Sequence, residues 1–256
     1  MFRTIFRNVI SKLLWLPALR VLACLAALGG WGVVDGTRAA QVVYFALDDP
    51  RGTLANSTQA FNNFAATLGT YGTDTLESYA NGAASPSLTF GASGITATTD
   101  TGFIAIVPPF AVTQSKVLVE KGPTSFGGEA FNDVFTFNQP ITAFGFFASN
   151  IGDGFANEIT FRLINTKLAT SSDVLITKLP GGGSQNNVAF LGVTDTKAFD
   201  RVLIIESNDF DSLVTDDYTA GFVVPEPSTL VLLAAGGLAL LWASGRRLVP
   251  GRKLGD

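Results

Sequence analysis

The sequence contains no histidine, and its one cysteine, Cys24, lies in an apolar N-terminal run. The chain therefore cannot form an internal disulfide, a Cys/His zinc site or a Ser-His-Asp triad, and the region after Cys24 has no cysteine nucleophile. The three tryptophans, Trp15, Trp31 and Trp242, also fall in the apolar ends. Any chemistry of the central region must rest on carboxylates, hydroxyls, amides, lysine and arginine.

Positive charge is scarce between Gln41 and Phe222, where eight basic residues accompany eighteen acidic ones, a net charge of −10. The other nine of the 17 basic residues lie in the two flanks. An acidic body repels phosphate backbones, so we expect no nucleic acid partner. Divalent cations, or solubility alone, fit this charge better.

The first forty residues are typical of a secretory signal peptide, which we assign to residues 1–40. An apolar run at 21–34 follows a basic region and precedes small residues, with cleavage expected after Ala39 or Ala40. Two alternatives remain open: an uncleaved anchor from Leu13 to Val34, and lipidation at Cys24. The basic region contains Arg3, Arg7, Lys12 and Arg20.

The C-terminal segment, residues 223–256, contains one uncharged apolar stretch, Thr229–Ser244. It is 16 residues long and could form a transmembrane helix, slightly under the usual length of about 17 to 25. Arg246 and Arg247 follow it and would stay in the cytoplasm by the positive-inside bias. An exported N-terminus would then place residues 41–222 outside the membrane.

Three parts of this tail occur in a specific order: Pro225-Glu226-Pro227-Ser228, the apolar helix, and Arg246-Arg247. This order resembles the PEP-CTERM sorting signal of Gram-negative bacteria that make extracellular polysaccharide. The resemblance implies that an exosortase, a membrane cysteine transpeptidase, cleaves near the tripeptide. Pro225, Glu226 and Pro227 would then be substrate for another enzyme, and the protein would be anchored transiently in the inner membrane before reaching the cell surface or the medium. The alternative is a simple C-terminal anchor with a proline hinge.

The central region, residues 41–222, reads as one all-β domain. Short runs rich in Val, Ile, Phe and Thr alternate with clusters of Gly, Asn, Asp and Pro. One helix is expected, capped by Asn56 or Ser57 and ended by Gly69. About a dozen strands predict an antiparallel β-sandwich of jelly-roll type. The expected strands are 42–47, 87–90, 95–99, 103–107, 116–119, 133–137, 141–149, 159–164, 174–177, 188–195, 202–206 and 213–218.

Two of these strands carry informative patterns. Residues 159–164 alternate, with Ile159, Phe161 and Leu163 on one face, as a half-buried strand requires. Residues 141–149 are apolar on both faces, which predicts a place at the centre of a sheet. Gly145 inside this run would weaken the strand unless it marks a bulge or a closely packed neighbouring backbone.

The acidic cluster is the strongest chemical signal of the domain, and Ca²⁺ is the one cofactor that it suggests. If the first and last strands pair, carboxylates from both ends of the domain could converge on one ion. The alternative is that aspartates cap turns and keep strand ends soluble. The candidate ligands are Asp209, Asp211, Asp216 and Asp217, with Asp48, Asp49 and Asp153 nearby in this arrangement.

The sequence predicts no catalytic residue, and we expect the protein not to be an enzyme. Two roles for the body stay open as alternatives. The first is a carbohydrate-binding, lectin-like module that would bind extracellular polysaccharide, although the domain contains no tryptophan to stack on a sugar. The second is a glycoside hydrolase with two carboxylates about 5 to 10 Å apart.

Overall fold

The computed structural model describes one mainly β domain with one α-helix among the residues that it places. All of these residues belong to the compact unit Gln41–Asp256. No helix in the described residues is long and apolar enough to cross a membrane. The described residues are 41–49, 52–100, 102–108, 111–113, 115–119, 124–126, 129–131, 133–151, 157–181, 187–207 and 214–224.

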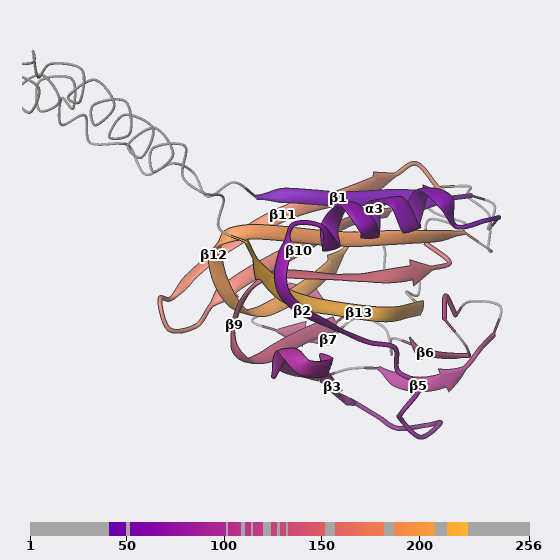
Figure 1. The fold of residues 1–256 in the computed structure, drawn as a ribbon, viewed down its shortest axis with the longest axis horizontal. Helices are drawn as coiled ribbons and strands as arrows, with labels where there is room; N and C mark the ends of the chain where they lie inside the picture. Colours follow the sequence, from indigo (N-terminus) through magenta and orange to yellow (C-terminus); the bar gives the residue numbers. More distant parts are fainter. Residues whose placement is uncertain are drawn as a thin grey trace, which may run out of the picture. The chain divides into compact units, whose positions relative to one another are not determined.

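Eleven strands form one antiparallel sheet, and two short strands form a separate hairpin (Figure 1). The prediction of an antiparallel β domain with one helix is therefore confirmed. The strands of the large sheet are β1 (Val42–Asp48), β2 (Leu68–Asp74), β3 (Ser87–Thr89), β4 (Thr96–Thr99), β5 (Phe103–Ile106), β6 (Lys116–Val119), β9 (Asp133–Ser149), β10 (Asn157–Asn165), β11 (Thr170–Leu179), β12 (Val188–Glu206) and β13 (Val214–Val223). The hairpin consists of β7 (Thr124–Phe126) and β8 (Glu129–Phe131).

The large sheet is folded into two layers, and the two long strands β9 and β12 each run through both of them. The second half of β9 pairs with the first half of β12, beside β1 and β13, and β13 also pairs with β2 and β6. The first half of β9 pairs with the second half of β12, beside β4 and β10. The sequence predicts four separate strands here. This was wrong because the strands continue through register shifts around Phe199, opposite Ile141, instead of ending in turns.

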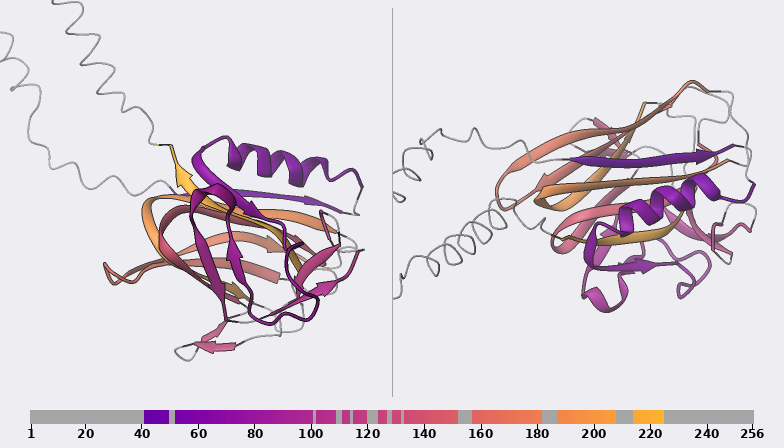
Figure 2. Two further views of the ribbon diagram at one scale, coloured as in Figure 1. Left: turned by 60° about the horizontal axis from the view of Figure 1, so that its bottom comes forward. Right: turned by 45° about the horizontal axis from the view of Figure 1, so that its top comes forward.

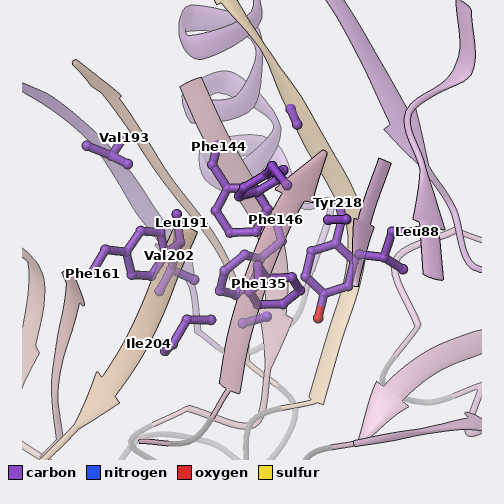
Figure 3. Packing of buried hydrophobic residues seen from close by; sticks show 14 of the residues in the cluster. Leu88, Phe135, Phe144, Phe146, Phe161, Leu191, Val193, Val202, Ile204 and Tyr218 are labelled. Atoms are coloured by element: carbon purple, nitrogen blue, oxygen red, sulfur yellow. The ribbon is translucent and has the colours of Figure 1, made fainter. Parts of the chain in front are cut away.

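The core lies between these two layers and is rich in phenylalanine (Figure 3). Rings from opposite layers touch: the centroid of Phe135 lies 5.0 Å from that of Phe144, and Phe146 lies 5.6 Å from Phe161. Tyr218 of β13 completes this group, 5.2 Å from Phe135. Burial of such large rings supplies most of the favourable free energy of folding in a domain of this kind.

The predicted patterns on two strands are confirmed. Ile159, Phe161 and Leu163 of β10 are buried, whereas the residues between them are only half-buried. Residues 141–149 lie at the centre of their layer, because this part of β9 pairs with β12 on one edge and β13 on the other. Gly145 marks a close approach of backbones: an added Cβ would lie 2.9 Å from the carbonyl oxygen of Leu191.

The helix α3 (Ala55–Ala65) packs on the outside of β1 and β12 (Figure 2). Phe64 and Phe190 meet there, with ring centroids 5.4 Å apart. The predicted caps were wrong, because Asn56 and Ser57 lie inside the first turn. The side chain of Asp48 accepts hydrogen bonds from both of their backbone N–H groups, at 3.1 and 2.9 Å.

The predicted end of the helix was also wrong. It ends at Ala65, and Gly69 already belongs to β2, a strand that the sequence patterns did not indicate. The backbone N–H of Ala66 donates to Asn62, and that of Thr67 donates to Phe64, which closes the last turn. The chain can turn here without a glycine because Ala66 keeps right-handed backbone angles, with φ −63° and ψ −19°.

Candidate functional site

Strand β13 directly precedes the predicted sorting segment in the chain. The backbone N–H of Val223 donates to the Thr142 hydroxyl at 2.7 Å, and that of Val224 donates to the Thr67 carbonyl at 3.0 Å. The body is therefore held in place up to the residue before Pro225. Pro225, Glu226, Pro227, Arg246 and Arg247 themselves lie outside the described residues, as does the whole predicted signal peptide.

The same strand carries two described members of the acidic cluster, Asp216 and Asp217. The pairing of β13 with β9 shifts register between Asp216 and Thr219, and Asp217 has a positive φ of 50°. This irregularity turns both carboxylates toward the segment before β6. Asp216 is 1% exposed and Asp217 is 7% exposed, so both are buried.

Asp216 holds this neighbouring segment through its backbone. Its Oδ2 accepts hydrogen bonds from the N–H groups of Val112 and Thr113, at 2.8 and 3.0 Å. Its Oδ1 accepts one from the N–H of Asp217 at 2.7 Å, and Asp217 in turn accepts one from the Thr113 hydroxyl at 2.7 Å. Both carboxylates thus have protein donors without any ion.

Glu77 is a third carboxylate of this group, and the sequence did not single it out. Its Oε1 accepts from the N–H groups of Ser115 and Lys116, at 2.9 and 2.7 Å. The Lys116 ammonium donates to the carbonyl oxygens of Glu77 and Tyr79. No sequence motif signals this contact, because Glu77 and Lys116 meet only through the fold.

We call the described residues 111–113 and 115–116, with the three carboxylates that hold them, the loop clamp. Burial, with the charge of Asp217, raises the pKa of Asp216 to about 7 despite three N–H donors. Burial also raises the pKa of Asp217; the Thr113 hydroxyl offsets part of this rise and the charge of Glu77 adds to it. Both shifts favour the protonated carboxyl groups in the folded protein.

The predicted calcium site is only partly within the described residues. Asp209, Asp211 and Asp153 lie outside them, so the full ligand set stays a prediction. Among the residues that the structure does describe, no group of three or more acidic, histidine or cysteine side chains could hold a metal ion.

The expected convergence of the first and last strands was wrong. β1 pairs with β12, not with β13, and β12 and β9 lie between β1 and β13. Asp48 therefore holds the start of α3 and does not join Asp216. The sheet order, which strand patterns alone do not fix, decides this.

A sugar-stacking surface requires exposed aromatic rings. Among the aromatic residues whose burial is described, Tyr71 of β2 is the exposed one, at 43%. Tyr44 and Tyr79 are half-buried, and Tyr218 lies in the core. Tyr79 is also engaged, since its hydroxyl donates to Asp74 at 2.6 Å.

The tail that follows β13 matches a known family model. Residues 223–247 match the model of the PEP-CTERM protein-sorting motif. The chain carries a PEP-CTERM protein-sorting motif. The match includes Val223 and Val224, so the sorting motif overlaps the last two described residues of the body.

Solved structures offer only distant likenesses to the body. The K2 cleaved adhesin domain of Lys-gingipain is 14% identical, with a TM-score of 0.36, and covers 59% of this chain and 97% of that one. The CBM22-1 xylan-binding domain of Xyn10C from Paenibacillus barcinonensis is 10% identical, with a TM-score of 0.35, over 58% and 99% of the two chains. With scores this low, neither likeness supports an inference about this protein. No curated protein shows a significant match.

The PEP-CTERM motif and the loop clamp are thus attached to one strand. β13 pairs with β6 near Thr215 and with β2 from Tyr218 onward, and it ends where the sorting motif begins. The sorting motif is fixed to the sheet at its first two residues, whereas the clamp lies at the other end of the same strand.

Proposed function

We propose that this protein is exported, held at the outer face of the inner membrane by its C-terminal segment, and then processed by an exosortase at Pro225-Glu226-Pro227. The observation that carries the proposal is the PEP-CTERM match at residues 223–247, at the point where β13 ends. The final location would be the cell surface or the medium.

The position of the tripeptide supports this proposal. Proline fixes φ, removes a backbone donor and disfavours helix at the residue before it, so the two prolines keep the chain extended. An extended segment is what a protease cleft accepts, and here it follows a strand whose last backbone donors are already bound. The predicted signal peptide at 1–40 and the membrane helix at 229–244 complete the pathway.

We infer that the body is a β-sandwich of jelly-roll type that serves as a binding or structural module and not as an enzyme. The described carboxylates support this, since Asp216 and Asp217 are buried and bound to protein donors. A link to extracellular polysaccharide is part of the proposal and rests on the sorting motif. This link is tested by applying the unmodified protein and Tyr71→Ala to a glycan array, with and without Ca²⁺. If the unmodified protein binds no glycan, the link to polysaccharide is refuted.

The sorting proposal is tested by expression in a host with and without an exosortase gene. We expect the mature protein to lose the mass of its C-terminal tail and to leave the membrane fraction only when exosortase is present. The double variant Pro225→Ala/Pro227→Ala should stay full-length and membrane-bound. Pro250→Ala, which lies beyond the matched motif, is the control and should be processed normally. Equal processing of the double variant would refute the proposal.

A further inference from the structure

The two ends of the described body lie at one end of the domain. Across the sheet, Val42 pairs with Thr194, Thr194 with Ala143, and Ala143 with Gly221, so these four residues stand at one level. The turn between β10 and β11 also lies here, because the Asn165 side chain donates to the carbonyl of Ala198 just beyond Thr194. Figure 1 shows the start of β1, this turn and the end of β13 at the same end. We call it the exit end.

The exit end combines exposed apolar and basic side chains. Leu168, at the tip of the β10–β11 turn, is 71% exposed, and Val42 and Val224 are 43% and 49% exposed. Lys167 beside Leu168 and Lys197 on the bend of β12 are exposed as well. Apolar side chains flanked by lysines are the composition that binds the interface of a phospholipid bilayer.

Two acidic side chains at the exit end, Asp195 and Asp200, are buried, and the exposed Asp173 nearby is paired with Arg162 at 2.7 Å. Asp195 is 3% exposed and accepts from Gln41 and from the N–H of Lys197. Asp200 is 8% exposed and accepts from the N–H and hydroxyl of Thr166. Asp195 and Asp200 stabilise the turns that present Leu168 and Lys197, so the exposed Lys167 and Lys197 add positive charge to this end.

The opposite end presents exposed acidic side chains among its described residues. Asp49 and Asp100 are exposed there, at the levels of Asp48 and Asp133. The exposed Lys178 is neutralised by Glu158, 3.2 Å away. A body with a net charge of −10 is repelled by an anionic bilayer in most orientations, and the exit end is the orientation that lowers this repulsion.

The length of chain that follows also places the exit end near lipid. Only residues 225–228 separate Val224 from the membrane helix predicted at 229–244. Four residues span at most about 14 Å. The hydrogen bond from Val224 to Thr67 holds the end of β13 on the sheet, so β13 adds no length to this connection. The anchored body cannot move far from the bilayer surface.

We propose that the exit end is a phospholipid-binding face, on which Leu168 inserts into the bilayer interface while Lys167 and Lys197 contact anionic headgroups. This inference rests on the C-terminal anchoring in the proposed function. It adds an orientation to that anchoring. The exit end faces the bilayer, the acidic end points away from it, and the sorting tripeptide lies between the body and the lipid.

The test uses the full chain in vesicles of phosphatidylethanolamine and phosphatidylglycerol with brominated acyl chains. Cys24→Ala removes the one natural thiol, so a single fluorescent label can be placed by Thr170→Cys at the exit end or by Thr53→Cys near Asp48. Both positions are exposed threonines, and the levels of Val42 and Asp48 are about 20 Å apart along β1. We expect lipid quenching at position 170 and none at position 53.

Substitutions of the face separate insertion from simple proximity. In the Thr170→Cys background, Leu168→Asp and the pair Lys167→Glu/Lys197→Glu should each abolish the quenching, and the pair should act only when phosphatidylglycerol is present. Lys178→Glu, the same change at the acidic end, should leave it intact. All changed side chains are exposed, and equal thermal unfolding curves confirm that each variant folds.

Three results would overturn the inference. If the chain floats with the vesicles but positions 170 and 53 are quenched alike, the face does not bind and only the anchor stands. If quenching at position 170 persists in both Leu168→Asp and Lys167→Glu/Lys197→Glu, the face likewise does not bind lipid. A chain that does not float with the vesicles removes the anchor itself, and with it both this inference and the membrane stage of the proposed function.

Discussion

The loop clamp predicts an unusual dependence of stability on pH. The Asp216 carboxyl has a pKa of about 7 in the folded protein, against 3.8 for the free group. Between these values the folded state binds one proton more than the unfolded state. Stability is therefore highest at low pH with respect to this group and falls as pH rises toward 7, which is the reverse of a carboxylate whose pKa is lowered by folding.

The size of the effect follows from the same two pKa values. One excess proton gives a slope of about 1.4 kcal/mol per pH unit, and the free energy of unfolding should fall by about 3 kcal/mol between about pH 5 and pH 8. The raised pKa of Asp217 acts in the same direction, so the pair titrates together. Asp48 and Asp173 have lowered pKa values and change their charge below this window.

Urea unfolding in non-ionic detergent, followed by far-ultraviolet circular dichroism, measures this dependence. Asp216→Asn should flatten the slope between about pH 5 and pH 8, because the amide does not titrate. Asp173→Asn, which removes an exposed carboxylate bound to Arg162 at 2.7 Å, should leave the slope unchanged. A stability that is flat or rises with pH in the unmodified protein, or an equal slope in Asp216→Asn, would refute the reasoning.

Three further changes have defined outcomes. Asp48→Ala should lower the free energy of unfolding by about 1 to 2 kcal/mol, measured by urea unfolding at neutral pH, because it removes the acceptor at the start of α3. Gly145→Ala should cost about 1 to 3 kcal/mol by the same measurement, since its Cβ would press on the backbone of β12, whereas Gly69→Ala meets the exposed Val224 side chain at 3.1 Å, with the nearest backbone atom at 3.9 Å, and should cost less. If the predicted calcium site exists, Ca²⁺ at about 100 times its Kd should stabilise the protein by roughly 2.7 kcal/mol relative to EGTA, and Asp211→Asn should cancel the shift in Tm.

Local patterns in the sequence were sufficient for the strands whose faces differ in polarity. The alternation at 159–164 and the continuous apolar run at 141–149 both appear in the sheet as expected, because burial on one or two faces imposes these patterns directly. Gly145 was informative for the same reason: a strand interior tolerates glycine where a neighbouring backbone needs the space.

Long-range pairings could not be predicted in this way. Asp48 resembles any strand-end aspartate in sequence, yet the fold uses it to hold α3. Glu77 carries no motif. It follows β2, and its contact with Ser115 and Lys116 forms because β2 and β6 both pair with β13. The expected meeting of the first and last strands failed because β12 and β9 lie between them. Strand order depends on the whole set of pairings, and residue spacing contains little of that information.

The sorting segment was predictable because its signal is contiguous, but its relation to the body follows from the sheet. β13 pairs with β9 on one edge and with β2 and β6 on the other, and Tyr218 is part of the core. All of these partners precede β13 in the chain, so this layer cannot close until Val223 is in place. The next proline cannot extend the sheet, because it has no N–H to donate. The end of β13 thus lies directly before the tripeptide, and an exosortase that cleaves there would act on a body already complete.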